Sequence, residues 1–214
     1  MIITIDGPAA SGKGTLARRL AQALGYAHLD TGALYRAVGL SMLRAGHDLD
    51  DAAQAEQIAG ALDLSLLEAP ALREQKTGQA ASAVARYPGV RTALLQLQRG
   101  FAATPPGAVL DGRDTGSVVC PNADVKLYVD AAVTERARRR AAELQAAGKD
   151  VSQADVEAEL AARDAQDKAR EEAPLVVPDG AVQLDTTRLS IEDALEAALK
   201  VVSAKKISRQ TGAD

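Results

Sequence analysis

The sequence predicts an α/β fold in which short parallel strands alternate with helices that cover both faces of the sheet. Short apolar, β-branched runs recur at residues 2–5, 108–111, 125–129 and 181–184. Stretches with apolar residues at helical spacing separate these runs. The chain has 214 residues, 47% of them hydrophobic and 25% charged, which is enough for one domain with a sizeable core.

The expected helices follow from the apolar periodicity and from glycines that end it. They span residues 13–24, 31–45, 52–62, 78–86, 90–101, 135–147, 152–170 and 191–204. Gly25 and Gly46 end the first two, as glycine commonly does after a helix. Residues 64–67 could form a further short strand before Pro70. We expect a core of residues 1–62 and 102–206, an insert over residues 63–101 and a flexible tail over residues 207–214.

Composition and charge argue against several classes of function. The formal net charge of −4 does not suit a protein that coats nucleic acid. One cysteine, Cys120, and two histidines, His28 and His47, argue against a zinc cluster. The first residues do not show the basic and apolar regions of a signal peptide, and no apolar run approaches the roughly 20 residues that span a bilayer. We therefore expect a cytoplasmic protein without nucleic-acid or membrane partners, and a monomer, because no exposed apolar stripe stands out.

The strongest motif is a glycine-rich loop between the first expected strand and the first expected helix. It consists of Gly7, Pro8, Ala9, Ala10, Ser11, Gly12, Lys13, Gly14 and Thr15. Such a loop points successive backbone N–H groups at one centre, the helix dipole favours an anion there, and the lysine neutralises outer phosphates. The alternative is an ordinary turn with a chance lysine, which the strand–loop–helix setting disfavours. Gly14 stands where the general pattern has the Ser or Thr that binds Mg²⁺.

A second motif, Asp-Gly-Arg-Asp-Thr-Gly, starts at Asp111 at the end of an expected strand. Ligands bind at the carboxyl ends of the strands in a parallel sheet, so Asp111 could hold Mg²⁺ there, directly or through water. Arg113 could bridge the donor and acceptor phosphates with its planar set of donors. The alternative is a common Asp-Gly turn followed by a solvated arginine.

A third motif lies at the start of the second expected helix. Thr31 can cap this helix, and Arg36 follows about one and a half turns later. A helix start with a nearby arginine can hold an acceptor phosphate, although capping alone would also explain the pattern.

Two basic helical segments follow near the end of the chain. Arg136, Arg139 and Arg140 can share one helical side, and the segment from Arg163 to Arg170 repeats that spacing around Asp167. Solvated charged faces usually explain such patterns. A kinase, however, must close arginines over the transferring phosphoryl group, and beside a phosphate loop we favour that interpretation.

Together these motifs resemble the bacterial cytidylate kinases, within the P-loop nucleoside monophosphate kinases. The resemblance runs from Ile3 to about Leu199, apart from residues 64–78. It implies a P-loop NTPase three-layer sandwich, with a parallel five-stranded sheet flanked by helices, a short acceptor-binding insert and a helical lid at about residues 148–170. It also implies transfer of the γ-phosphoryl group of ATP to CMP or dCMP, with Mg²⁺ as the cofactor.

The motifs and the resemblance together assign roles to individual residues. The catalytic residues would be Lys13, Arg36, Arg113 and Arg163. ATP would be bound by the loop of residues 7–15 with Arg139 and Thr187, and the metal would be held by Asp111 through water. CMP would be bound by Thr31, Arg36, Ser82, Arg91, Arg113, Asp114, Arg163, Asp167 and Arg170. Within the CMP set, Ser82, Arg91 and Asp114 would read the cytosine, while Arg163 and Asp167 would approach the sugar.

The chain departs from the family pattern in its acceptor-side insert. This insert is shorter than expected, and a small β-hairpin that normally precedes the Ser82 segment is missing. The residues assigned to cytosine nevertheless remain. Two other interpretations stay open: a P-loop kinase for another small acceptor, such as UMP, shikimate or a coenzyme precursor, and a non-catalytic ATP-binding regulatory module.

Overall fold

The computed structural model describes residues 1–211, with side chains to residue 208. It divides into two compact units. The first, here called the sheet unit, comprises Met1–His28 and Thr104–Asp214; the second, here called the helical unit, comprises Leu29–Ala103. The helical unit thus begins well before the insert expected from residue 63.

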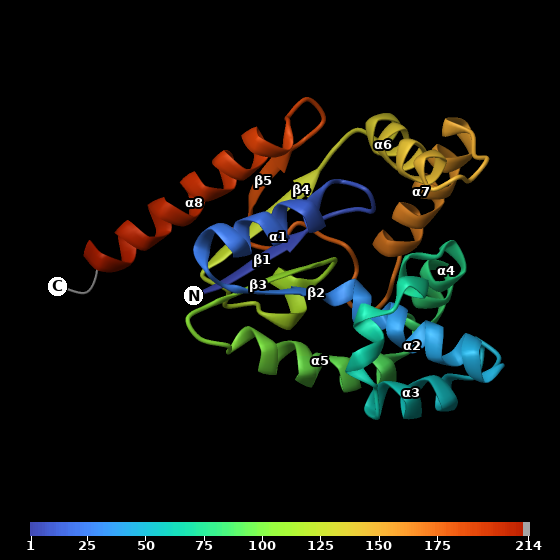
Figure 1. The fold of residues 1–214 in the computed structure, drawn as a ribbon. Helices are drawn as coiled ribbons and strands as arrows, with labels where there is room; N and C mark the ends of the chain where they lie inside the picture. Colours follow the sequence, from blue (N-terminus) through green and yellow to red (C-terminus); the bar gives the residue numbers. More distant parts are fainter. Residues whose placement is uncertain (212–214) are drawn as a thin grey trace. The chain divides into compact units, whose positions relative to one another are not determined.

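The sheet unit is built on a sheet with the strand order β2-β3-β1-β4-β5 (Figure 1). Its elements are β1 (Ile2–Asp6), α1 (Lys13–Leu24), β3 (Ala108–Gly112), the π-helical turn η3 (Thr115–Val119), β4 (Val125–Asp130), α6 (Val133–Ala146), α7 (Gln153–Lys168), β5 (Val182–Asp185) and α8 (Ile191–Thr211), and β2 (Ala27–Asp30) starts in it. β1 pairs in parallel with both β3 and β4, and β4 pairs in parallel with β5. The predicted α/β fold with a five-stranded sheet is confirmed.

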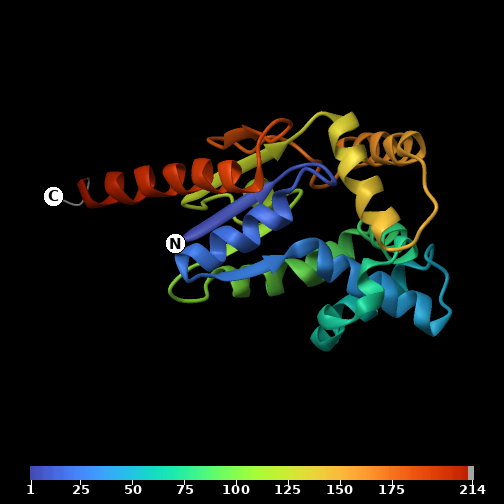
Figure 2. The ribbon, with the colours of Figure 1, turned by 45° about the horizontal axis from the view of Figure 1, so that its top comes forward.

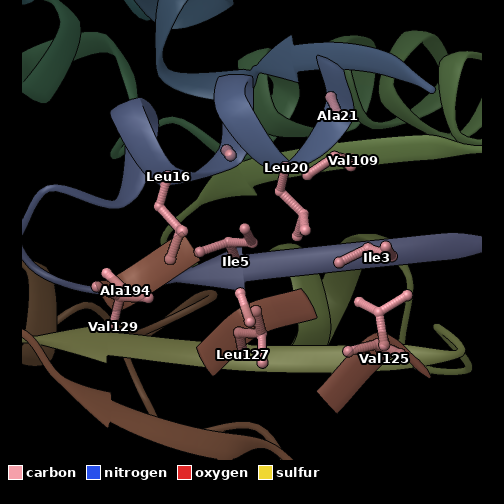
Figure 3. Close-up of a cluster of buried hydrophobic side chains, with 13 residues drawn as sticks. Ile3, Ile5, Leu16, Leu20, Ala21, Val109, Val125, Leu127, Val129 and Ala194 are labelled. Carbon is pink, nitrogen blue, oxygen red and sulfur yellow. The ribbon is translucent and has the colours of Figure 1, made fainter. Parts of the chain in front are cut away.

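The hydrophobic core of the sheet unit lies between the sheet and two helices. In Figure 3, Leu16 and Leu20 of α1 point toward Ile3 and Ile5 of β1. α8 adds small side chains such as Ala194 to the same cluster. Side chains alternate along a strand, so Thr4 and Asp6 of β1 point to the opposite face from Ile3 and Ile5. On β1, η3 packs against this opposite face. The turn that follows β3 is therefore packed directly against β1.

The register places the polar ends of two central strands side by side. In the β1–β3 pairing, Ile5 lies opposite Asp111, and Asp6 lies opposite Gly112. The glycine-rich loop leaves β1 directly after Asp6, so both sequence motifs meet at one edge of the sheet, as the parallel topology predicts.

The helical unit consists of helices packed around α2. Its elements are α2 (Thr31–Ala45), α3 (Ala52–Gly60), the 3₁₀ turns η1 (Leu64–Glu68) and η2 (Pro70–Arg73), α4 (Gln75–Val84) and α5 (Pro88–Ala102). Gly39 lets α2 approach α4 closely, because a Cβ atom there would lie 2.9 Å from the backbone of Ala80. α3 packs against α5 as well (Figure 2). This packing makes α2 part of the same compact unit as the expected insert.

Two local predictions were wrong, and one strand was not predicted. Residues 64–67 form a 3₁₀ turn and not a strand, because the carboxylate of Asp63 accepts the N–H of Ser65 and starts a turn. The strand β2 was not predicted. Residues 207–211 continue α8, so the expected tail does not begin at residue 207, and residues 212–214 lie outside the described part of the chain. No described helix is long and apolar enough to cross a membrane.

Candidate active site

The glycine-rich loop has a backbone that only certain residues allow. Gly12 adopts a left-handed conformation (φ 85°) directly before α1. Gly7 leaves no room for a side chain, because a Cβ atom there would lie 2.0 Å from the carbonyl oxygen of Val129. The two glycines therefore fix where the loop leaves β1 and where it enters the helix.

Side chains from several elements bind the carbonyl oxygens of this loop. The donors are Arg113 Nη1 to Gly7 O (3.0 Å), Lys13 Nζ to Pro8 O (3.2 Å), Arg136 Nη1 to Ala9 O (3.1 Å) and Thr186 Oγ1 to Ser11 O (2.9 Å). The C=O and N–H of a trans peptide point in opposite directions, so these bonds turn the N–H groups to the other side of the loop. A concave row of N–H groups at a helix N-terminus is an anion-binding site.

Asp111 lies beside the loop at the end of β3. A Cβ atom on Gly14 would lie 3.4 Å from Asp111 Oδ2, so the absence of a side chain at this position leaves space beside the carboxylate. His28 Nε2 lies 2.8 Å from the other oxygen, Oδ1, and orients it. Within residues 1–208 no group of three or more potential ligands is arranged to hold a metal ion. One carboxylate next to a phosphate loop nevertheless fits Mg²⁺, which keeps several waters and binds phosphate oxygens.

Asp167 of α7 holds two of the predicted phosphate-binding arginines. Its Oδ2 accepts from Arg113 Nε at 2.7 Å, and its Oδ1 accepts from Arg170. Burial alone would raise the pKa of this carboxyl group, but the charges of Arg113 and Arg170 hold the pKa below its ordinary value. The structure therefore brings Arg113, Asp167 and Arg170 together within the sheet unit. Arg163 lies one turn before Asp167 on the same helix.

Arg136 is a structural residue and does not belong to a solvated face. Its guanidinium is buried and donates to Ala131 O, to Ala9 O and to Asp164 Oδ2, the last at 2.6 Å. It thus joins α6 to the glycine-rich loop and to α7. Sequence reasoning placed Arg136 with Arg139 and Arg140 on one basic face and could not distinguish their environments.

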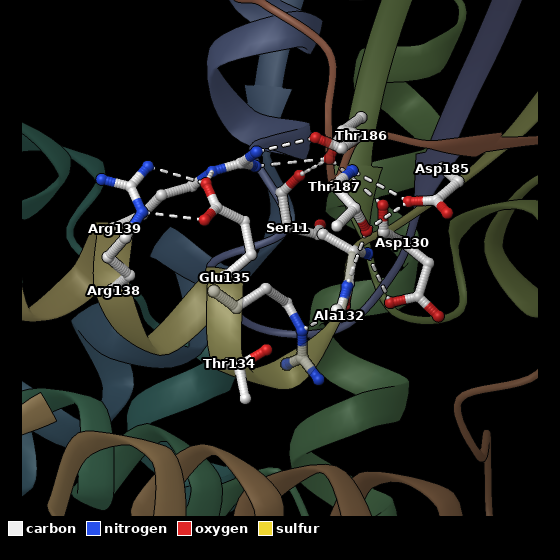
Figure 4. A network of polar contacts seen from close by, with 12 residues as sticks. Ser11, Asp130, Ala132, Thr134, Glu135, Arg138, Arg139, Asp185, Thr186 and Thr187 are labelled. Atoms are coloured by element: carbon white, nitrogen blue, oxygen red, sulfur yellow. Dashed lines mark hydrogen bonds and ion pairs between the residues drawn. The ribbon is translucent and has the colours of Figure 1, made fainter. Parts of the chain in front are cut away.

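Arg139 and Thr187 belong to a second polar network, which includes Ser11 of the loop (Figure 4). Arg139 donates to Glu135 Oε1 (2.8 Å) and to the carbonyl oxygen of Thr186 (2.7 Å). Thr187 Oγ1 donates to Asp185 and accepts the N–H of Ala132 at 2.9 Å. Glu135 and Thr186 were not predicted. Since Thr186 also binds Ser11 O, this network is connected directly to the glycine-rich loop.

The helical unit holds the predicted phosphate residues at the start of α2. The helix is capped by Asp30, whose Oδ1 accepts the N–H of Ala33 at 3.1 Å, and Thr31 is the first residue of the helix and not its cap. Arg36 Nη2 donates to Asp30 Oδ2 at 2.5 Å. The guanidinium of Arg36 is thus held back toward the helix N-terminus, where positive charge and N–H groups suit an anion.

Two of the three predicted cytosine residues, Ser82 and Arg91, lie on α4 and α5 of the helical unit. Ser82 Oγ donates to the carbonyl oxygen of Gly78 at 3.2 Å. Arg91 donates to the carbonyl oxygen of Ala85 at 3.2 Å, and its guanidinium lies over the ring of Tyr35, 5.6 Å from the centroid. Tyr35 was not predicted. Its place within the Asp-Thr-Gly-Ala-Leu-Tyr-Arg motif, one residue before Arg36, was the available signal.

A buried carboxylate at the end of β1 was also missed. Asp6 is fully buried and accepts Thr115 N and Oγ1, each at 2.8 Å, and Gly116 N at 2.7 Å. Burial, together with a smaller effect of the charge of Asp114, raises its pKa to about 6, although these hydrogen bonds lower it. Asp114, predicted to read cytosine, is itself buried, and its carbonyl oxygen accepts Val118 N at the start of η3.

The sheet, the phosphate loop and the arginines beside it define a P-loop phosphotransferase. The cytidylate kinase family model matches residues 3–204. The chain belongs to the cytidylate kinase family.

Two curated relatives agree with this assignment over nearly their whole length. A cytidylate kinase of Rhodopseudomonas palustris (strain BisA53) is 52% identical over 98% of this chain and 99% of its own. A cytidylate kinase of Xanthobacter autotrophicus is 54% identical over 98% of this chain and 100% of its own. The crystal structure of TT1252 from Thermus thermophilus is similar at 25% identity, with a TM-score of 0.51 over 96% of this chain and 97% of that chain.

Proposed function

We propose that this protein transfers the γ-phosphoryl group of ATP to CMP or dCMP, giving ADP and CDP or dCDP. The observation that carries the proposal is a phosphate loop whose carbonyl oxygens are hydrogen-bonded by Arg113, Arg136 and Thr186. This loop occurs in a chain that matches the cytidylate kinase family over residues 3–204. The same observation argues against a purely regulatory ATP-binding module, because arginines for the transferred group accompany the loop.

In the proposed mechanism the sheet unit holds the donor nucleotide. The N–H groups of residues 7–15 and the ammonium of Lys13 bind the ATP phosphates, and Arg139 and Thr187 lie on the adenine side. Asp111 would hold Mg²⁺ through water, and the ion would neutralise charge on the outer phosphate oxygens. Arg113 is held by Gly7 O and Asp167, so its remaining N–H groups are oriented before the nucleotide binds.

The proposed acceptor residues rest on the family match over residues 3–204. Arg36, beside Thr31 at the start of α2, would bind the acceptor phosphate, and Arg113 would bridge it to the donor. Arg163 and Arg170 would stabilise the charge that develops on the transferred group, with Asp167 holding Arg170 in place. The acceptor phosphate is already an anion near neutral pH, so the reaction needs no general base.

The base is the second part of the acceptor to be recognised. Hydrogen bonds from Ser82, Arg91 and Asp114 would read the edge of cytosine, and the cation–π contact with Tyr35 would keep the Arg91 guanidinium in place. We further propose that the protein is a cytoplasmic monomer of pyrimidine metabolism that acts on free nucleotides, without nucleic-acid or membrane partners.

A coupled assay of ADP formation with Mg²⁺ tests the proposal against CMP, dCMP, UMP, AMP and shikimate. We expect rapid turnover with CMP and dCMP. Lys13→Ala and Arg113→Ala should each lower kcat by at least about 100-fold. Lys200→Ala and Arg19→Ala, on exposed surfaces, are the matched controls and should retain activity. Turnover with another acceptor but not with CMP, or ATP binding without any turnover, would contradict the proposal.

A further inference from the structure

The carboxylate of Asp6 connects the two phosphate-binding motifs. It is the last residue of β1 and directly precedes the phosphate loop. Its two oxygens accept three hydrogen bonds from the residues that follow Asp114: Thr115 N and Thr115 Oγ1 at 2.8 Å, and Gly116 N at 2.7 Å. All atoms of this contact are buried. The mechanism above gives none of these three residues a role.

The loop that Asp6 holds is the one that carries Arg113. On one side of Asp114, Arg113 Nη1 donates to Gly7 O at 3.0 Å; on the other side, Thr115 and Gly116 donate to the side chain of Asp6. The loop after β3 is therefore attached at two points to two consecutive residues, Asp6 at the end of β1 and Gly7 directly after it.

The fit around Gly116 shows how closely the loop approaches the strand. A Cβ atom on Gly116 would lie 2.8 Å from Thr4 Oγ1 and 3.2 Å from Asp6 Oδ2. Only glycine allows the backbone N–H at this position to reach the carboxylate. Three short hydrogen bonds to one buried carboxylate leave the loop little freedom to shift.

We propose that Asp6 is a positioning residue, which fixes the loop of Thr115 and Gly116 and thereby holds Arg113 at the place where the phosphoryl group is transferred. This inference rests on the proposed function. A displacement of about 1 Å in such a group can cost about 100-fold in rate. Asp6 itself touches neither phosphate nor metal in this role, so its effect must pass through Arg113.

Two pairs of variants test the role of this contact. Asp6→Asn replaces one acceptor oxygen by a donor that faces Gly116 N, and Thr115→Val removes the hydroxyl. We expect kcat to fall about 10- to 100-fold in both, with KM for ATP changed by less than about three-fold. Thr115→Ser restores the hydroxyl and should return kcat to within about three-fold of the wild type. Asp124→Asn is the matched control, because Asp124 accepts Ile2 N at 2.7 Å at the opposite end of β1.

A double-mutant cycle with Arg113→Ala separates positioning from general damage. If Asp6 acts through Arg113, adding Asp6→Asn or Thr115→Val to Arg113→Ala should lower kcat by no more than about two-fold further. Multiplicative losses, a raised KM for ATP with unchanged kcat, or an equal effect of Asp124→Asn would overturn the proposal. If Asp6→Asn does not fold, Thr115→Val and Thr115→Ser carry the test alone. A wild-type protein inactive on CMP would instead refute the proposed function.

Discussion

Replacing Arg136 by methionine should destabilise the protein far more than the same change two residues later at Arg138. Both arginines lie on α6, but the side chain of Arg136 is 6% exposed and that of Arg138 is 62% exposed. Arg136 binds Asp164 at 2.6 Å and two carbonyl oxygens, whereas Arg138 makes a surface ion pair with Glu135.

The expected magnitudes follow from these environments. Removing one partner of a buried ion pair leaves the other charge uncompensated, which costs about 3–5 kcal/mol. In Arg136→Met this charge is Asp164, whose side chain is 13% exposed. An exposed pair contributes about 0–1 kcal/mol, so Arg138→Met should change the free energy of unfolding by less than about 1 kcal/mol.

Urea denaturation followed by circular dichroism measures both changes. A cycle with Asp164→Leu adds a sharper criterion, because the double variant Arg136→Met, Asp164→Leu removes both charges of this buried pair. It should be more stable than Arg136→Met alone by at least about 2 kcal/mol. A loss below about 1 kcal/mol in Arg136→Met, or a double variant as unstable as the sum of its parts, would refute this account.

Three further predictions concern Asp6, the α2–α4 contact and Asp167. Folding raises the pKa of the Asp6 carboxyl group from 3.8 to about 6, so the folded protein binds this proton more tightly than the unfolded chain does. The stabilising effect of this protonation is fully present below pH 3.8 and is lost as the pH rises through 6. When the pH is lowered from 7 to 4, the free energy of unfolding of the wild type should therefore rise by up to about 3 kcal/mol relative to that of Asp6→Asn, as measured by urea denaturation at each pH. A difference between the two proteins that does not change with pH would contradict this. Gly39→Ala should lower the free energy of unfolding by about 1–3 kcal/mol, because the new Cβ would meet the backbone of Ala80. Gly78→Ala should raise it by about 0.5–1 kcal/mol, because a Cβ there meets open space beside α4. Equal thermal midpoints of the two variants would refute the close contact of α2 with α4. Asp167→Asn should lower the free energy of unfolding by about 3 kcal/mol and should also lower kcat, because Arg113 and Arg170 would lose the carboxylate that binds them. An unchanged kcat would show that Asp167 does not belong to the site.

The sequence predicted those elements best that end at a strong local signal. The bounds of α1 and α2 were right because Gly25 and Gly46 adopt the left-handed conformation (φ 67° and 71°) that ends a helix. β2 was missed because a four-residue strand with two polar residues carries little periodic signal. Residues 64–67 alternate like a strand, but a side chain just before them starts a 3₁₀ turn.

The candidate site was predictable as a set of motifs and less so as a set of contacts. The positions of the phosphate loop, Asp111 and Arg113 follow from the topology of a parallel sheet. The environments of individual arginines do not follow from it, because Arg136 and Arg139 have the same sequence signature on one helix. One is buried against the phosphate loop, and the other binds Thr186 at the end of the sheet. Only the tertiary packing of α6 decides between these roles.

The same reasoning applies to the phosphate loop itself. Glycines allow its backbone conformation, but its carbonyl oxygens are held by Arg113 from the loop after β3, Arg136 from α6 and Thr186 from the end of β5. Without these donors the carbonyl oxygens would need water molecules as hydrogen-bond partners, and the N–H groups of the loop would no longer point in one direction. The glycine-rich motif is therefore necessary for phosphate binding but not sufficient. Phosphate binding by this motif depends on side chains that lie up to 175 positions further along the chain, as Thr186 does from Ser11.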